Sequence, residues 1–420
     1  MEQKLDIKPT EEQQQAIDEI LEWFDNGDSP YKTLAGYAGT GKTTILGIIV
    51  NAVEQRSGKS FFSNRKVAVT ATTNKAVKVL TQRINSTHFM TIHSLLSIKP
   101  KRVGDKEVFE QDKYKGSDMD MSSFDLVVVD ECSMISKKLL RIIDNEIVGD
   151  TKVLFCGDPA QLEPINEDVS KCFSFSPAML KTVIRHDDAI ASKAKIVRER
   201  TTPVSVESLL NEPHIVRREK AQVFPLFENF RKDPDRNRVL CWTNKNVHRW
   251  NRTLRKFDWG ETPEHEFQEG DIIIANSPCE DSDKKEIIML NSEEGRILEV
   301  DEQDTFYRLT VEIDRVFTGK HRVTVRALKK EFESSVTDQL NLLADEARED
   351  WTKWDDFWRL KKYYHDIRHC YAMTVHKSQG SGFHNVVVDW ADIRANRDIL
   401  NRNQLLYVAL TRAENQVIIV

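Results

Sequence analysis

Apolar residues in the first 175 positions occur as short β-branched runs that alternate with segments of helical periodicity. The runs TLAG, KVAVTAT, DLVVVDE and KVLFCGD occupy residues 33–36, 66–72, 125–131 and 152–158. Short apolar runs separated by amphipathic segments are typical of parallel strands joined by crossover helices. This part of the chain is therefore predicted to be an α/β unit with a parallel sheet.

The pattern changes several times after that. A polar stretch around KEVFEQDKY, between Ser94 and Phe124, predicts a small hairpin insertion, and a second unit is expected from about Ala178. Five strand-like runs then follow within residues 271–327: DIIIANS, EIIML, GRILEV, FYRLTVEI and HRVTVRA. They predict a small antiparallel barrel. The last sixty residues return to α/β patterning, with VVVDW and QVIIV as strands.

A helical segment between the barrel and the last unit carries three tryptophans at spacings of three and four residues. Trp351, Trp354 and Trp358 fall on one face of that helix. A packed core stripe is the preferred interpretation, and stacking on nucleic-acid bases is the alternative.

Composition limits the class of protein. The chain has 420 residues, 40% of them hydrophobic, and two to four domains are expected at this size. No apolar stretch is long enough to span a membrane, and the first ten residues lack the features of a signal peptide, so a cytoplasmic location is expected. The six cysteines form no CxxC pair, which favours reduced buried thiols over disulfides or zinc ligands.

Charge is distributed unevenly along the chain. The net charge is −6, but Lys181 to Lys256 contains 18 basic and 9 acidic residues, whereas Asp258 to Leu360 contains 13 basic and 27 acidic residues. The basic middle segment is able to hold phosphates, and solvated charged faces without a partner are the alternative.

The residues GYAGTGKT, at 36–43, form the most informative motif. They fit the phosphate-binding pattern of two glycines four residues apart followed by Lys and Ser/Thr, with a strand before it and a helical pattern after it. Glycines there allow positive φ and close backbone approach to phosphate, Lys42 is placed to meet the β/γ oxygens, and Thr43 offers a hydroxyl to Mg²⁺. The predicted nucleotide-binding residues of this loop are Gly36, Ala38, Gly39, Thr40, Gly41, Lys42, Thr43 and Thr44.

Two further segments follow apolar strands and carry groups suited to phosphate hydrolysis. In LVVVDE, Asp130 is placed to hold Mg²⁺ through water, and Glu131 to polarise a water for attack on the γ-phosphate. In GDPAQLEPI, Gln161 is placed to sense that phosphate or its attacking water. An arginine from a second domain, Arg412 in LYVALTRAE with Arg185 as a second candidate, predicts an arginine finger worth roughly 4 to 7 kcal/mol.

The ordered set of motifs resembles the superfamily 1 helicases of the 5′-to-3′ branch. The matching segments, in sequence order, are TEEQQQAI, GYAGTGKT, VTATTNKA, TIHSLL, VVVDECSM, GDPAQLEPI, VIRH, CWTNKNV, TVHKSQGS and YVALTRAE. The resemblance covers nearly the whole chain. Three positions depart from the family pattern: Thr72, Asn74 and Glu163.

The resemblance implies roles for further residues. Gln13 is expected to read the adenine edge, and Gly380 to lie close to the γ-phosphate. Phe109 is expected at the aromatic tip of a strand-separating pin, with packing on its own domain as the alternative. The remaining residues are expected along a single-strand DNA track: Thr73, Asn74, Thr91, His93, Thr243, Asn244, Thr374, His376 and Lys377.

The implied architecture consists of two RecA-like P-loop domains with two insertions. Motor domain 1A is expected at 1–95 and 123–176, a pin at 96–122, motor domain 2A at 177–264 and 361–420, and an SH3-like barrel with a helical arm at 265–360. The barrel and its Trp-bearing helix are expected to brace the pin or to dock a partner.

The implied function is an ATP-dependent DNA helicase that uses ATP and Mg²⁺, acts on single-stranded and fork DNA and works as a monomer. A single-strand-binding or replication protein is a possible partner, and the resemblance favours a phage source. Three alternatives remain at this point: a single-strand translocase that displaces proteins with little unwinding, a recruitment module with a nucleotide switch, and a small-molecule kinase.

Overall fold

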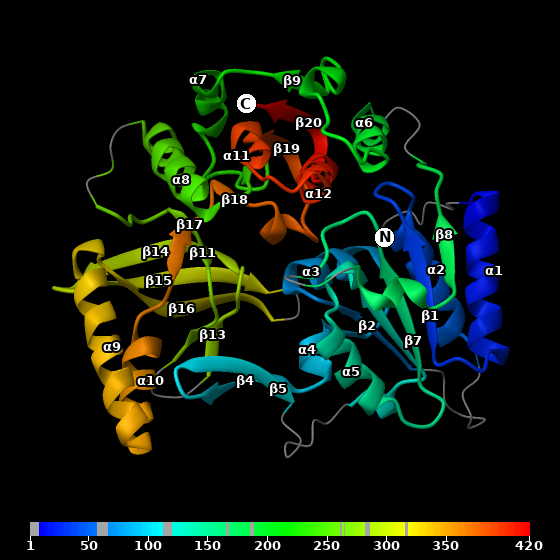
Figure 1. Cartoon of the computed structure of the whole chain (residues 1–420), viewed down its shortest axis with the longest axis horizontal. Helices are drawn as coiled ribbons and strands as arrows, with labels where there is room; N and C mark the ends of the chain where they lie inside the picture. Colours follow the sequence, from blue (N-terminus) through cyan, green and yellow to red (C-terminus); the bar gives the residue numbers. More distant parts are fainter. Residues whose placement is uncertain are drawn as a thin grey trace.

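The computed structural model describes residues 8–420 except for 57–65, 112–119, 165, 166, 168, 185–188, 261, 262, 264, 282–285, 316 and 317. Figure 1 shows two lobes, each built around a parallel sheet, and a third part formed by an antiparallel sheet with two helices along its side. In the described ranges, no helix is both long enough and apolar enough to cross a bilayer.

The first lobe is a six-stranded parallel sheet in the order β3-β2-β6-β7-β1-β8. Its strands are β1 (Tyr31–Gly36), β2 (Val67–Ala71), β3 (His88–Thr91), β6 (Leu126–Asp130), β7 (Lys152–Gly157) and β8 (Pro177–Leu180). Its helices are α1 (Glu11–Asn26), α2 (Lys42–Glu54), α3 (Asn74–Arg83), α4 (Ile92–Leu95) and α5 (Lys137–Glu146).

Alternation of side chains along β6 shows how this sheet is covered on both faces. Leu126 and Val128 belong to a core shared with α1, α2 and α3, whereas Val127 and Val129 belong to a core shared with α4 and α5. A strand buried on both sides needs a continuous apolar run, and this explains why LVVV signalled a parallel strand.

The second lobe is a five-stranded parallel sheet in the order β18-β10-β19-β20-β9. Its strands are β9 (Ile215–Arg217), β10 (Asn237–Cys241), β18 (Ala372–Thr374), β19 (Phe383–Val388) and β20 (Ala413–Ile419). Its helices are α6 (Ala189–Arg198), α7 (Lys220–Val223), α8 (Asn244–Trp259), α11 (Trp390–Arg394) and α12 (Ile399–Thr411). The predicted α/β class with two parallel sheets is confirmed.

The third part contains a five-stranded antiparallel sheet in the order β16-β15-β14-β11-β17. Its strands are β11 (Ile272–Ala275), β14 (Glu294–Glu302), β15 (Phe306–Arg315), β16 (Gly319–Leu328) and β17 (Ile367–His369). The separate pair β12 (Cys279–Glu280) and β13 (Ile287–Met289) lies beside it, and α9 (Glu333–Glu349) and α10 (Trp354–Tyr363) form the helical arm. Of the five expected runs, EIIML therefore pairs outside the main sheet, and β17 takes its place.

Two expected boundaries are corrected by strand pairing. Residues 177–180 were assigned to the second lobe, but β8 pairs with β1 in the first lobe. The expected return to the second lobe at residue 361 falls inside α10, and β17 still pairs with β11 in the antiparallel sheet. The strands β8 and β17 are four and three residues long. They are too short for hydrophobic periodicity to assign them to one part of the molecule.

The expected hairpin is present as β4 (Ile98–Val103) and β5 (Lys106–Gln111), joined at Gly104 with φ 59°. Its turn lies against the helical arm, as Figure 1 shows, because Trp358 Nε1 donates to Gly104 O at 2.9 Å and Lys361 Nζ donates to Asp105 O at 3.1 Å. Trp358 is 2% exposed, whereas Trp351 is 79% exposed. The core interpretation therefore holds for Trp358 and fails for Trp351, which precedes the helix proper.

Short 3-10 turns complete the described structure at Met121–Ser123, Cys132–Met134, Lys171–Ser174, Val206–Ser208, Phe224–Phe227, Lys330–Phe332, Trp351–Lys353 and His376–Ser378. All six cysteines are buried and carry free thiols, as the sequence predicted.

Candidate nucleotide site and nucleic-acid track

The phosphate loop runs from the end of β1 to the start of α2. Gly39 and Gly41 have φ values of 80° and 82°, and Gly41 caps α2. Gly36 is not in the left-handed region, which differs from the expectation, but a Cβ there would lie 2.8 Å from Thr40 Oγ1. Gly36 is thus needed because the loop packs closely against it. Gly39 and Gly41 are needed because the loop backbone adopts positive φ at both positions.

Lys42 lies in the first turn of α2, and its ammonium group points back over the loop. Its Nζ donates to Gly36 O at 2.7 Å and to Tyr37 O at 3.0 Å. Thr43 follows it in the same turn, and Thr44 is exposed. The ammonium group therefore lies beside the glycine-rich backbone, where a bound phosphate would meet it.

Asp130 ends β6 and Glu131 follows it with φ 54°, a left-handed conformation that is rare for a residue with a side chain. Burial raises the pKa of Asp130 in spite of the nearby Lys42. Burial and the charge of Asp130 raise the pKa of Glu131 to about 7, opposed by Arg412 and Lys42. Backbone strain and shifted acidity at one position are typical of a catalytic site.

Gln161 and Arg412 approach this site from different lobes. Gln161 lies after β7 and is 5% exposed, while Arg412 ends α12 of the second lobe and is 8% exposed. Arg412 donates to Ser381 O and Thr411 Oγ1, both at 3.2 Å. In the part of the chain that the structure describes, Gln161 Oε1 and Arg412 Nε are buried without a hydrogen-bond partner. Such orphaned polar atoms fit a site that receives a polar ligand.

Gln13 contacts the phosphate loop. It belongs to the N-terminal capping box of α1, and its Nε2 donates to Thr40 O at 3.0 Å while its Oε1 accepts from Thr10 N at 2.9 Å. Gly380 has φ 71°, and a Cβ there would lie 3.0 Å from Ala76 and 3.5 Å from Thr73 Oγ1. Gly380 therefore packs on the start of α3, so its predicted place near the phosphate stays a prediction. Arg185 lies outside the described residues.

Several predicted DNA-binding residues share one structural feature, because they follow strands at the edges of the two parallel sheets. Thr73 caps α3 after β2, Thr91 caps α4 after β3, and Thr243 caps α8 after β10. The order of strands places β3-β2 at one edge of the first sheet and β18-β10 at one edge of the second. Helix N-termini at these edges present backbone N–H groups, which are suited to phosphate oxygens.

The other predicted contacts lie beside these caps. Asn74 and Asn244 are the first residues of α3 and α8, and Thr374 ends β18. Burial lowers the pKa of His93 and of His376. Burial also lowers the pKa of Lys377, which donates to Asn276. Phe109 lies within β5 opposite Pro100, not at the hairpin turn, so the predicted position at a tip is wrong for its backbone.

Several residues that organise the site belong to no motif recognised in the sequence. Asp392 of α11 accepts from Trp242 N, Thr243 N, Thr243 Oγ1 and Asn246 Nδ2 at 2.7 to 2.9 Å, so it fixes the start of α8. Tyr407 of α12 bonds to both Ala38 and Asp158 of the first lobe. These partners are far apart in the sequence, and a lone acid or tyrosine gives no periodic signal.

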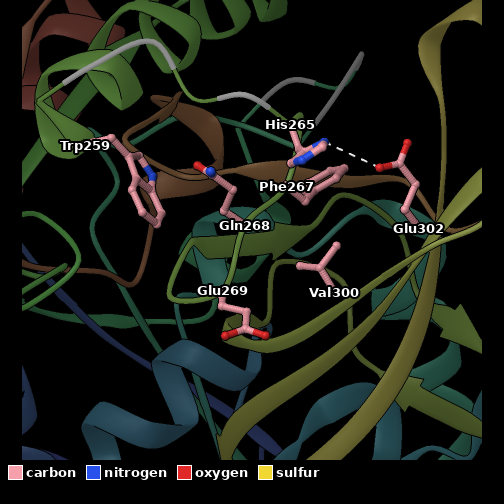
Figure 2. Close-up of a pocket in the computed structure, with 7 residues that line it drawn as sticks. All are labelled: Trp259, His265, Phe267, Gln268, Glu269, Val300 and Glu302. Atoms are coloured by element: carbon pink, nitrogen blue, oxygen red, sulfur yellow. Dashed lines mark ion pairs between the residues drawn. The ribbon is translucent and has the colours of Figure 1, made fainter.

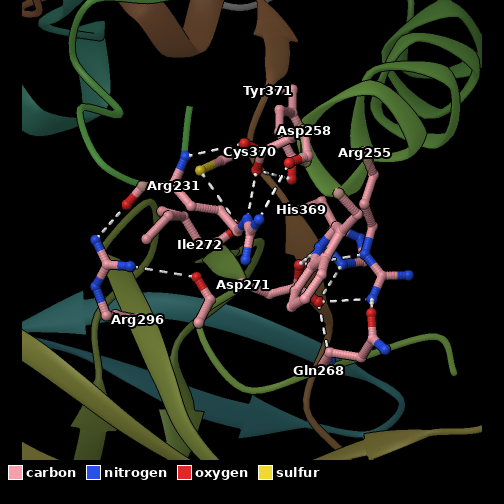
Figure 3. A network of polar contacts seen from close by, with 12 residues as sticks. Arg231, Arg255, Asp258, Gln268, Asp271, Ile272, Arg296, His369, Cys370 and Tyr371 are labelled. Atoms are coloured by element: carbon pink, nitrogen blue, oxygen red, sulfur yellow. Dashed lines mark hydrogen bonds and ion pairs between the residues drawn. The ribbon is translucent and has the colours of Figure 1, made fainter. Parts of the chain in front are cut away.

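A buried ionic network joins the second lobe to the antiparallel sheet, as Figure 3 shows. Arg255 of α8 donates to both oxygens of Asp271 at 3.2 and 2.8 Å, and Asp271 is 0% exposed. Arg238 of β10, also 0% exposed, pairs with Glu294 of β14 at 3.1 Å. Glu294 also pairs with Lys75 of α3 at 3.3 Å and therefore joins all three parts of the molecule.

An open pocket of about 520 Å³ lies in the same region (Figure 2). It is lined by Trp259, His265, Phe267, Gln268, Glu269, Val300 and Glu302, with His265 Nδ1 3.4 Å from Glu302. Its residues come from α8, β14 and the segment between α8 and β11, and it contains no residue of the phosphate loop. It is therefore a feature separate from the nucleotide site.

Two parallel sheets, a phosphate loop and a buried arginine from the opposite lobe define a P-loop ATPase with paired motor lobes. A family model described as an AAA domain matches residues 8–217, and a UvrD-like helicase C-terminal domain model matches residues 369–420. The chain belongs to this AAA domain family and, as its motif order indicates, to the superfamily 1 helicases of the 5′-to-3′ branch.

Individual relatives agree with this assignment. The chain is 26% identical to the ATP-dependent DNA helicase dda of Enterobacteria phage T4, over 92% of this chain and 93% of that protein. It is 21% identical to the RecBCD enzyme subunit RecD of Mycolicibacterium smegmatis, over 92% of this chain and 67% of that protein. A solved structure of Pif1 helicases, described as the basis for DNA unwinding at forked duplex DNA, aligns with a TM-score of 0.54 at 17% identity, over 98% and 92% of the two chains.

Proposed function

We propose that this protein is an ATP-dependent DNA helicase that moves 5′-to-3′ along single-stranded DNA and separates duplex DNA in replication, recombination or repair. The observation that carries the proposal is the burial of Arg412, from the second lobe, beside Glu131 of the first. A phosphate site shared between two lobes couples hydrolysis to relative movement of those lobes.

The side chains of the nucleotide site divide the work of hydrolysis. The backbone of Gly39 to Thr43 faces the phosphates, and Lys42 neutralises their charge. Glu131 accepts the proton of the attacking water, Gln161 orients that water, and Arg412 stabilises charge on the transferred phosphoryl group. Gln13 would contact the adenine, and Arg185 is a second candidate finger.

Thr43 and Asp130 are the residues that would hold Mg²⁺. A hydroxyl and a carboxylate at the end of neighbouring elements are oxygen ligands of the kind this cation prefers. When bound there, the cation supplies positive charge to the β- and γ-phosphate oxygens.

The capped helix starts at the two sheet edges form the proposed DNA track. Its contacts would be made to phosphates and sugars by Thr73, Thr91, Thr243 and their neighbours, so the grip would be independent of sequence. Relatives described as a DNA helicase and as unwinding forked DNA support single-stranded and fork DNA as partners. We further propose a monomer in the bacterial or phage-infected cytoplasm, with a replication protein as a possible partner.

The β4–β5 hairpin is the proposed pin, and its attachment to α10 would hold it against the force of strand separation. The rival function is a single-strand translocase that displaces proteins with little unwinding, in which Phe109 of β5 would have no part in strand separation. Replacement Phe109→Ala decides between them: a loss of strand separation supports the pin, and unchanged unwinding supports the translocase.

The first test of the proposal is ATP hydrolysis with and without single-stranded DNA. We expect stimulation by DNA in the wild-type chain and loss of nearly all turnover in Lys42→Ala, because the ammonium group that neutralises the phosphates is removed. DNA-stimulated turnover that survives Lys42→Ala would overturn the catalytic assignment.

A further inference from the structure

The hydroxyl of Tyr407 joins the two lobes at the nucleotide site. Tyr407 Oη donates to Asp158 Oδ2 at 2.5 Å and accepts from Ala38 N at 3.1 Å. Tyr407 is 1% exposed and Asp158 is 0% exposed. One side chain of the second lobe thus contacts both the phosphate loop and the segment that follows β7.

The surroundings of Tyr407 show that this contact belongs to a packed interface. Ala38 and Ala160 of the first lobe pack against the core of the second lobe, and Leu162 is buried within that core. Tyr37, the residue before Ala38, also contacts the second lobe, because the guanidinium of Arg198 lies 3.3 Å from the centre of its ring. The phosphate loop and the Gln161 segment are therefore both held by the second lobe.

Tyr407 is linked to both segments that carry the unpaired groups Gln161 Oε1 and Arg412 Nε. Asp158 holds the turn that carries Gln161. Its Oδ1 accepts from Ala160 N at 2.9 Å, and its carbonyl oxygen accepts from Gln161 N at 3.2 Å. In the other direction, α12 continues from Tyr407 to Thr411, and Arg412 caps it. A shift of Tyr407 relative to Asp158 would therefore move Arg412 relative to Gln161.

We propose that Tyr407 is a positioning residue that sets the spacing of Gln161 and Arg412 around the phosphate loop when the lobes are closed. The inference rests on the proposed function and adds a contact to it. Burial and the neighbouring Asp158 raise the pKa of Tyr407, so its hydroxyl keeps its proton and remains a donor at every pH used for assay.

The experiment compares Tyr407→Phe with a matched variant, Tyr371→Phe. Tyr371 is also buried, and its Oη donates to Asp258 Oδ2 at 2.9 Å within the second lobe (Figure 3). Each variant loses one hydroxyl that bonds to a buried aspartate, but only Tyr407 spans the two lobes. Steady-state ATP hydrolysis with saturating single-stranded DNA is measured for both variants, with thermal unfolding as the check on folding.

We expect Tyr407→Phe to lower kcat by about tenfold and to leave KM for ATP within about threefold, because small misplacements of catalytic groups act on turnover. Tyr371→Phe should retain the wild-type kcat within about twofold, because its lost hydrogen bond lies within one lobe and acts on stability. Combining Tyr407→Phe with Asp158→Asn should be no worse than the poorer single variant, because both changes act on the same contact: one removes the donor hydroxyl and the other replaces the charged acceptor by a neutral amide.

Three results would overturn this inference and leave the proposed function intact. They are equal kcat values in Tyr407→Phe and Tyr371→Phe, a change in the KM of Tyr407→Phe without a change in its kcat, or additive effects of Tyr407→Phe and Asp158→Asn on kcat. A rise in kcat would also overturn it, because the contact would then be a latch that hydrolysis has to break. A wild-type chain without DNA-stimulated hydrolysis would instead overturn the proposed function, and this inference with it.

Discussion

At the scale of single residues, the nucleotide site depends on groups that the surrounding fold holds in unusual states. Glu131 combines φ 54° with burial that raises its pKa to about 7. Neither property stabilises a fold, because a left-handed backbone and a buried carboxyl each cost free energy. Both properties would be accounted for by the proposed role of Glu131 as the base for hydrolysis.

Replacement Glu131→Gln tests that role. The amide keeps the size of the side chain but cannot accept a proton, so we expect DNA-stimulated kcat to fall by about 10²-fold to 10⁴-fold. Binding of a fluorescent ATP analogue should remain, since Lys42 and the loop are intact. Turnover within tenfold of wild type would assign the base to another residue.

The positions of Lys42, Asp130 and Glu131 could be predicted from the sequence, because each lies at a fixed offset from an apolar strand that precedes it. Tyr407 could not be predicted in the same way. Its partners Asp158 and Ala38 lie 249 and 369 positions away, and only the packed interface between lobes brings them together.

At the scale of elements, the hairpin and the helical arm form one unit. Trp358 is held between cations, with the guanidinium of Arg102 5.3 Å and the ammonium of Lys361 4.6 Å from its ring. Arg102 also pairs with Glu280 of β12 at 3.1 Å. The hairpin is thus attached at its turn as well as at its base, so force on it is passed to the third part of the molecule.

Replacement Trp358→Phe tests this attachment. It keeps an apolar ring but removes the hydrogen bond to Gly104 O, so we expect strand separation to slow while DNA-stimulated ATP hydrolysis stays within twofold of wild type, a difference of about 0.4 kcal/mol. Trp23→Phe is the matched control, because Trp23 Nε1 donates to Ser29 O at 2.8 Å within the first lobe. Equal unwinding rates in the two variants would contradict a bracing role.

The hairpin itself was predictable from the polar stretch between two α/β elements. Its docking site was not, because the three tryptophans show the same helical spacing whether they face a core, a base or a hairpin. Short strands such as β8 and β17 were assigned to the wrong part for a related reason, since pairing partners decide their place.

At the scale of the whole molecule, buried ion pairs hold the parts together. Burial by itself opposes ionisation, but Arg238 and Lys75 lower the pKa of Glu294 from 4.5 to about 2. Asp271 behaves alike, since His369 and Arg255 outweigh burial and lower its pKa from 3.8 to about 2. These pairs fix the antiparallel sheet to the second lobe.

Acid unfolding follows from those values. A carboxyl group whose pKa is lower in the folded state stabilises the fold above its ordinary pKa and loses that contribution as pH falls to the folded pKa. The contribution of Glu294 and Asp271 to the free energy of unfolding should therefore be constant above about pH 5 and be lost between about pH 4.5 and pH 2, so the thermal unfolding midpoint should fall across that lower range. A midpoint that stays constant down to pH 2 would contradict the assignment.

Replacement Asp271→Asn should cost about 3 to 5 kcal/mol of unfolding free energy, because it leaves the guanidinium of Arg255 buried without its charge partner. Asp345→Asn is the control, since Asp345 pairs with Arg348 on an exposed helix face and should change stability by less than about 1 kcal/mol. Denaturant unfolding of both variants measures the difference. Equal losses of unfolding free energy would mean that the buried Asp271–Arg255 pair contributes no more to stability than the exposed Asp345–Arg348 pair.

We propose that ATP hydrolysis between the two lobes drives movement 5′-to-3′ along one DNA strand. The most direct measurement compares strand separation of a partial duplex that carries only a 5′ single-stranded tail with one that carries only a 3′ tail, in the presence of ATP and Mg²⁺. We predict rapid separation from the 5′ tail and almost none from the 3′ tail. Separation from the 3′ tail alone would contradict the claimed direction, and separation from neither would contradict the claim of unwinding.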